Sequence, residues 1–165
     1  MKKIIFLFVF ILNSSLFSQN ISLDGLRREY QQVNKDSASC AKLYKKIIKS
    51  NSADLVTIAY RGAITASMAN YPKNKMDKLK IFNSGKKLIE QSIAADSSNI
   101  ETRFLRFTIQ SYCPKALGYS KQITSDKNFI LKNYSAVSNI AVKKMIQSFF
   151  LQSKVLTEIE KQKFE

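Results

Sequence analysis

One stretch, from Phe82 to Ser111, constrains the fold more than any other part of the chain. Apolar or small residues recur in its first half at steps of three and four, which places them on one face of a helix. The run from Asp96 to Asn99 then offers side-chain oxygens that can cap a helix, and Glu101 follows where the helix dipole favours an anion. The stretch therefore predicts two helices joined by a capped turn, the second beginning near Ile100 and ending at Pro114, because proline cannot continue a helix.

The same pattern occurs 45 residues earlier in the chain. When Ala41–Ile64 is laid over Lys86–Ile109, seven of 24 positions are identical, and Arg61 falls on Arg106. Helix pairs that recur at a fixed period indicate a repeat architecture. The alternative is chance identity in a chain rich in lysine, serine and isoleucine.

Turn-forming residues are scarce, since the whole chain has only four glycines and two prolines. An all-β fold would need more of them, so we predict an all-α fold of antiparallel helix-hairpin repeats, about eight helices in one domain over residues 20–165. The expected helices span 23–33 with Ser22 as cap, 37–50, 53–70, 74–95, 100 to Pro114, 125–134, 136–152, and a short last helix from the capping box Thr157/Glu160 to Phe164.

Small residues line one face of the helix expected over 53–70. They include Ala59, Gly62, Ala63 and Ala66, and such side chains let a second helix approach closely. Glycine inside a helix costs up to about 1 kcal/mol relative to alanine. We therefore predict that Gly62 is a packing contact.

Residues 1–19 have the layout of a secretory signal. Lys2 and Lys3 precede an unbroken apolar run from Ile4 to Leu12, and small and polar residues follow it. The run is too short to span a bilayer. We expect cleavage near Gln19, an exported protein in the periplasm or outside the cell, and no transmembrane span after removal of the signal. An uncleaved anchor is the alternative.

The A-D-S-S-N joint between the two expected helices resembles the turn of tetratricopeptide-type repeats. Three further segments, AYRGAITASMA, ETRFLRFTIQ and PKALGYSKQITSDKNFI, resemble a group of secreted bacterial helical proteins that share the pattern Y-x-G-A … E-x-R-F-L-R-F … P-x-x-L-G-Y … D-K-x-F-I. The resemblance covers about residues 41–130. It implies a helical fold and carries no known activity.

Composition argues against catalysis. The chain has no histidine, which excludes Ser-His-Asp and Cys-His sites and removes the usual general base. S-x-x-K occurs at Ser39/Lys42 and Ser84/Lys87 without its companion motifs, and no glycine-rich phosphate loop is present. Two cysteines without histidine make a poor metal site. We expect no enzyme activity, no cofactor and no metal; Cys40 and Cys113 are either free thiols or a disulfide.

The chain is strongly basic, with 27 basic and 12 acidic residues and a net charge of +15. Such an excess attracts anionic polymers or membrane headgroups. For an exported protein we expect an anionic envelope component rather than nucleic acid. The alternative is a solvated exterior, because the lysines are scattered along all the expected helices.

Arginines in apolar helices are the most informative polar residues, because a buried charge needs an anionic partner. One interpretation is an internal ion-pair network that involves Glu101 or Asp126. The other is a concave site in which arginines bind a carboxylate or phosphate. The candidate binding residues are Arg61, Arg103, Arg106, Gln110 and Tyr119.

Taken together, these features predict an exported, non-catalytic helical-repeat interaction module of the bacterial cell envelope. Its partner would be another envelope protein or an anionic envelope component. The alternative function is binding of a small anionic ligand or anionic envelope polymer by the arginine cluster.

Overall fold

The computed structural model describes residues 21–33 and 36–164, so the signal expected at residues 1–19 lies outside the described residues. Within these ranges the chain forms helices and no strands, which confirms the all-α class. The α-helices are α1 (Leu23–Tyr30), α2 (Ser37–Ile47), α3 (Leu55–Met68), α4 (Lys75–Ala95), α5 (Ile100–Tyr112), α6 (Ile123–Asn133), α7 (Ile140–Gln152) and α8 (Glu158–Lys161). Short 3₁₀ turns are η1 (Lys115–Leu117), η2 (Tyr134–Ala136) and η3 (Gln162–Phe164).

Side-chain caps fix where most helices begin. The hydroxyl of Ser22 accepts a hydrogen bond from the backbone N–H of Gly25 and starts α1, as predicted. Asn99 caps α5 in the same way, and Thr157 with Glu160 forms the predicted capping box of α8. Each such cap satisfies a backbone N–H that would otherwise lack a partner at the helix terminus.

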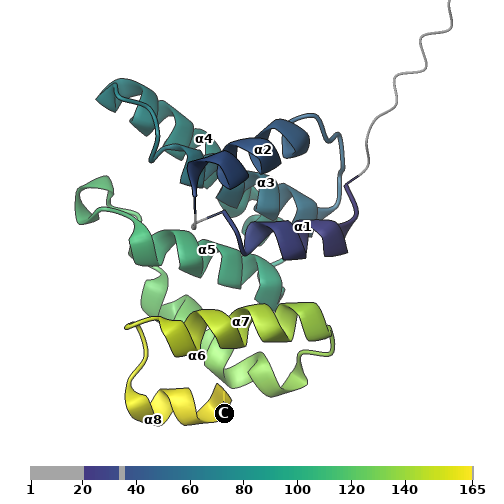
Figure 1. The fold of residues 1–165 in the computed structure, drawn as a ribbon. Helices are drawn as coiled ribbons and strands as arrows, with labels where there is room; N and C mark the ends of the chain where they lie inside the picture. Colours follow the sequence, from purple (N-terminus) through teal and green to yellow (C-terminus); the bar gives the residue numbers. More distant parts are fainter. Residues whose placement is uncertain (1–20, 34–35, 165) are drawn as a thin grey trace, which may run out of the picture.

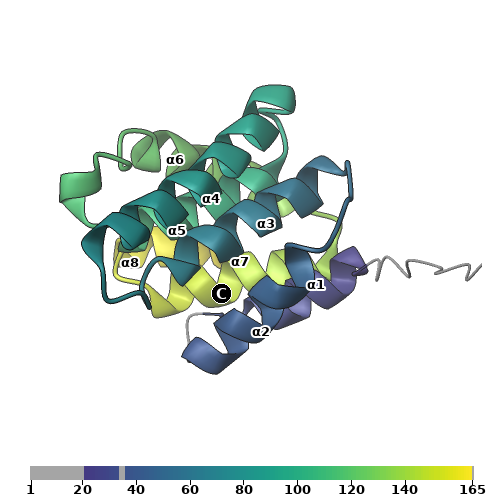
Figure 2. The ribbon, with the colours of Figure 1, turned by 90° about the horizontal axis from the view of Figure 1, so that it is seen from above.

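The helices stack in layers, as Figure 1 shows: α2, α3 and α4 lie at the top, α1 and α5 lie at about the same height below them, and α6, α7 and α8 lie at the bottom. Seen from above in Figure 2, α3 and α4 run side by side, with α1 and α2 on one side and α6 on the other. One apolar core links these layers from Leu26 of α1 to Phe164 at the end of η3. Because α5 is central, nine of its 13 residues are buried.

The helices α3 and α4 approach each other closely at Gly62 and Gly85. A Cβ atom on Gly62 would lie only 2.7 Å from the carbonyl oxygen of Gly85. A Cβ atom on Gly85 would collide with the backbone of α3 at Ala66. The predicted packing role of Gly62 is therefore confirmed, and the partner is a second glycine that brings the two backbones into contact.

Several helix limits differ from those expected. The first helix ends at Tyr30 and continues only as a turn to Val33. The helix expected to begin at Ala136 begins at Ile140, because Asn139 caps it and residues 134–136 form η2 instead. The irregular segment after Pro114 contains η1, which ends at Gly118 with a left-handed φ of 62°.

The second helices of the two overlaid units, α3 and α5, follow the N-caps Asp54 and Asn99, which are 45 positions apart. Their first helices differ, since α2 has 11 residues and α4 has 21. A hairpin repeat thus stays a prediction. Within the described ranges, every helix is too short or too polar to cross a bilayer.

We expect Gly85→Ala to destabilise the protein. The added methyl group has no space between α3 and α4, and overpacking costs about 1–3 kcal/mol, which exceeds the gain in helix propensity of at most about 1 kcal/mol. Urea unfolding measures the change. The control is Gly25→Ala, whose Cβ would meet no backbone atom and would approach only the Ser22 hydroxyl, at 3.1 Å, so that a shift of a few tenths of an ångström accommodates it. Equal stability of the two variants would show that the close approach is not needed.

Candidate functional site

The arginine candidates on α5 meet Asp126 of α6. Arg106 donates to both carboxylate oxygens of Asp126, from Nε at 2.6 Å and from Nη2 at 2.8 Å. Its Nη1 donates to Glu90 of α4 at 2.9 Å, and Arg103 donates to Asp126 at 3.1 Å. The bidentate geometry makes this the strongest type of ion pair available to arginine.

The two central charged groups of this network are buried, so each of them needs a partner inside the protein. Asp126 is 0% exposed and Arg106 is 5% exposed. Burial alone disfavours the charged guanidinium, but the hydrogen bonds and charges of Asp126 and Glu90 outweigh it and raise the pKa of Arg106. All three nitrogens of Arg106 thus have carboxylate partners inside the protein.

A second buried network surrounds Glu101 at the start of α5. Its carboxylate accepts hydrogen bonds from Nε and Nη2 of Arg27 in α1, both at 2.8 Å. It also accepts one from the hydroxyl of Tyr60 in α3 at 2.8 Å. Sequence reasoning missed Arg27. Its only signal was that an anion in an apolar helix needs a cation, and with 27 basic residues in the chain that signal does not single out Arg27.

Of the other candidates, Tyr119 joins one of these networks, whereas Arg61 and Gln110 do not. Tyr119 donates to Glu90 at 2.6 Å and so reaches the Asp126 network through that carboxylate; burial, followed by this hydrogen bond, raises its pKa. Arg61 donates to the backbone oxygen of Ser50 at 2.9 Å. Gln110 is buried, and its amide has no hydrogen-bond partner among the described residues.

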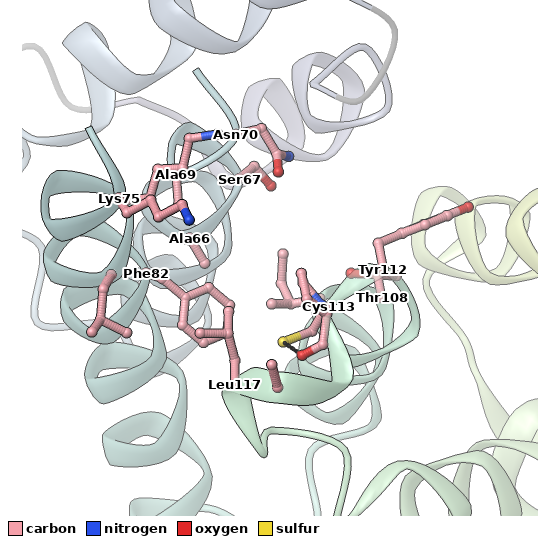
Figure 3. Close-up of a pocket in the computed structure, with 15 residues that line it drawn as sticks. Ala66, Ser67, Ala69, Asn70, Lys75, Phe82, Thr108, Tyr112, Cys113 and Leu117 are labelled. Atoms are coloured by element: carbon pink, nitrogen blue, oxygen red, sulfur yellow. Dashed lines mark hydrogen bonds between the residues drawn. The ribbon is translucent and has the colours of Figure 1, made fainter. Parts of the chain in front are cut away.

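A pocket of about 490 Å³ opens between α3, α4, α5 and η1, and sequence reasoning did not identify it. In Figure 3, Ala66, Ser67 and Phe82 face it from one side, while Thr108, Cys113 and Leu117 face it from the other. We call this cavity the α3–α4–α5 pocket. The residues that line it are Ala66, Ser67, Ala69, Asn70, Lys75, Lys78, Leu79, Phe82, Thr108, Ile109, Tyr112, Cys113, Pro114, Ala116 and Leu117.

The lining of the α3–α4–α5 pocket combines an apolar part with a cationic edge. Most of the lining side chains are apolar, whereas Lys75 and Lys78 of α4 are exposed to solvent, and the lining includes neither aspartate nor glutamate. The Thr108 hydroxyl is already used, since it donates to the backbone oxygen of Leu105 at 2.8 Å and lies 3.0 Å from the hydroxyl of Tyr30. Burial raises the pKa of Tyr30 to about 12, so this phenol is neutral at physiological pH.

Two other hollows are less suited to hold a ligand. One of about 260 Å³ lies between α1, α5 and α7 and shares Thr108 and Tyr112 with the α3–α4–α5 pocket. The other has about 700 Å³ but is bordered by only six residues, around Lys132 and Lys163. The α3–α4–α5 pocket combines a ligand-sized volume with walls from several elements.

Neither cysteine forms a disulfide. Cys40 is buried, with its Sγ 3.5 Å from Sδ of Met68, and Cys113 lies at the α3–α4–α5 pocket. Burial raises the pKa of both thiols, which disfavours the reactive thiolate. Among the described residues, no three cysteine or carboxylate side chains gather as they would to hold a metal ion.

Comparisons with known proteins give no match: no family model fits the chain, and neither the curated proteins nor the solved structures contain a similar one. The resemblance to tetratricopeptide-type and secreted helical proteins therefore stays a prediction. The site has to be interpreted from its own geometry.

We expect Asp126→Asn to destabilise the protein by about 3 kcal/mol, because it leaves two arginine side chains facing a neutral amide inside the fold. Urea unfolding measures the loss. The control is Glu29→Gln, which removes an exposed pair with Lys46 and should cost less than about 1 kcal/mol. If Asp126→Asn were as stable as the control, the network would not be structural and the arginines would be open to a ligand.

Proposed function

We propose that the protein is a non-catalytic binding module of the cell envelope that takes up an apolar ligand in the α3–α4–α5 pocket. The observation that carries the proposal is the pocket itself. Its volume of about 490 Å³ falls within the range of roughly 300–1,000 Å³ that is typical of ligand sites. Its lining is mostly apolar, so transfer of an apolar group from water into it is favourable.

A binding role accords with the side chains at the pocket better than catalysis does. The chain has no histidine, and the lining contains no carboxylate that could act as a general base. Cys113 lines the cavity, but burial raises the pKa of its thiol, and its Sγ hydrogen-bonds to the backbone oxygen of Pro114 rather than to a basic side chain. The lining therefore offers binding groups without a catalytic set.

The envelope location rests on the sequence of residues 1–19, which has the charge and hydropathy pattern of an export signal. Export stays a prediction. Its test is the N-terminal sequence of the protein recovered from the envelope, which should begin near Gln19 or Asn20. Recovery of the intact precursor would contradict it.

The arginine cluster is a weaker candidate for ligand binding. Nε, Nη1 and Nη2 of Arg106 already donate to Asp126 or Glu90, so an incoming anion would have to displace a buried carboxylate. Displacement would leave that carboxylate buried without its partner, which is costly. Binding of an anionic ligand by the arginine cluster thus stays a prediction, and the stability of Asp126→Asn addresses it.

The proposal is tested with the neutral apolar dye N-phenyl-1-naphthylamine, whose fluorescence rises in an apolar site. We expect saturable binding, one dye per chain. Ala69→Phe, which places a ring in the pocket, should weaken binding at least about tenfold, or about 1.4 kcal/mol.

The matched control is Ala94→Phe, an exposed position on α4 outside the pocket lining. It should bind the dye as the natural chain does. Circular dichroism establishes that both variants remain helical. Absence of saturable binding in the natural chain, or equal binding by the two variants, would contradict the proposal.

A further inference from the structure

Charge is distributed asymmetrically around the α3–α4–α5 pocket. Two lysines, Lys75 and Lys78, line it one helical turn apart at the start of α4, and both are exposed. Neither forms a salt bridge with a described residue, and Asp77 between them in sequence does not line the pocket. The edge formed by these lysines is therefore cationic and uncompensated by the protein.

Most of the rest of the lining has the opposite character, with Ser67 and Asn70 as polar exceptions. Phe82, Leu79, Ile109 and Leu117 supply apolar surface, and the hydroxyl of Thr108 is occupied by hydrogen bonds within the protein. A polar group placed against these residues would lose water without gaining a partner, which is unfavourable. The part of the occupant that lies against them must consequently be apolar.

We propose that the α3–α4–α5 pocket binds an amphiphile with one acyl chain and an anionic headgroup, the chain against the apolar lining and the anion on Lys75 and Lys78. This inference rests on the proposed function, because it names the ligand class of the same pocket. The headgroup is a carboxylate or a phosphate, since an ammonium group pairs with either as a point charge. Such a molecule is one form of the anionic envelope component that the basic composition predicts.

An acyl chain suits this cavity better than a segment of a protein partner does. A peptide would bring backbone N–H and C=O groups, and the inner lining offers few unused polar groups to receive them. A hydrocarbon chain has no such groups, so its transfer is favourable along its whole length. Two adjacent cations at the edge then orient the molecule by its headgroup.

The test is displacement of N-phenyl-1-naphthylamine from the natural chain by laurate, dodecyl phosphate and the neutral dodecanol. We expect all three to displace the dye. The double substitution Lys75→Gln/Lys78→Gln should weaken the binding of laurate or dodecyl phosphate about fivefold more than the binding of the dye and of dodecanol, because only the anions pair with the lysine charges. The anion with the larger change identifies the headgroup.

The matched control is Lys80→Gln/Lys87→Gln, which removes the same charge from exposed positions of α4 outside the pocket lining. It should bind every ligand as the natural chain does. Equal affinity of both double variants for the anions would overturn the inference while leaving dye binding, and thus the proposed function, intact. Failure of the dye and of dodecanol to bind the natural chain would overturn both.

Discussion

The close contact between Gly62 and Gly85 is the constraint on which the rest of the structure depends. It brings the backbones of α3 and α4 together, because neither position has room for a Cβ atom. Ala66, one turn after Gly62, and Phe82, about one turn before Gly85, then line the α3–α4–α5 pocket from adjacent helices. The pocket therefore lies directly beside this backbone contact, where the two walls formed by α3 and α4 have little freedom to move.

Two buried ionic networks fix the position of α5, which forms the third wall of the pocket. Asp126 and Glu90 engage Arg106 and so join α5 to α6 and α4, while Glu101 engages Arg27 and Tyr60 and joins α5 to α1 and α3. Buried ion pairs add little net stability, but they constrain how the helices pack, because a misplaced partner leaves a buried charge unpaired. With α5 fixed from both sides, the cavity next to Thr108 is preformed rather than created by a ligand.

Local signals in the sequence predicted most of the helices. Ser22, Asn99 and the Thr157/Glu160 box were identifiable because caps act over three or four residues. Contacts between distant residues could not be identified in this way. Arg27 and Glu101 are 74 positions apart, and nothing in the sequence indicates that they pair. The pocket was missed for a related reason. Its lining consists mainly of small and apolar residues from several elements, which in sequence look the same as core residues.

Heteronuclear NMR of the isotopically labelled chain during a titration with laurate tests most directly whether the α3–α4–α5 pocket is the functional site. Amide signals of residues such as Ala69, Lys78 and Cys113, which come from three separate parts of the chain, should shift together and saturate at one laurate per chain. Shifts confined to the surroundings of Arg103 and Arg106, or small shifts scattered over the surface without saturation, would contradict a binding site in this pocket.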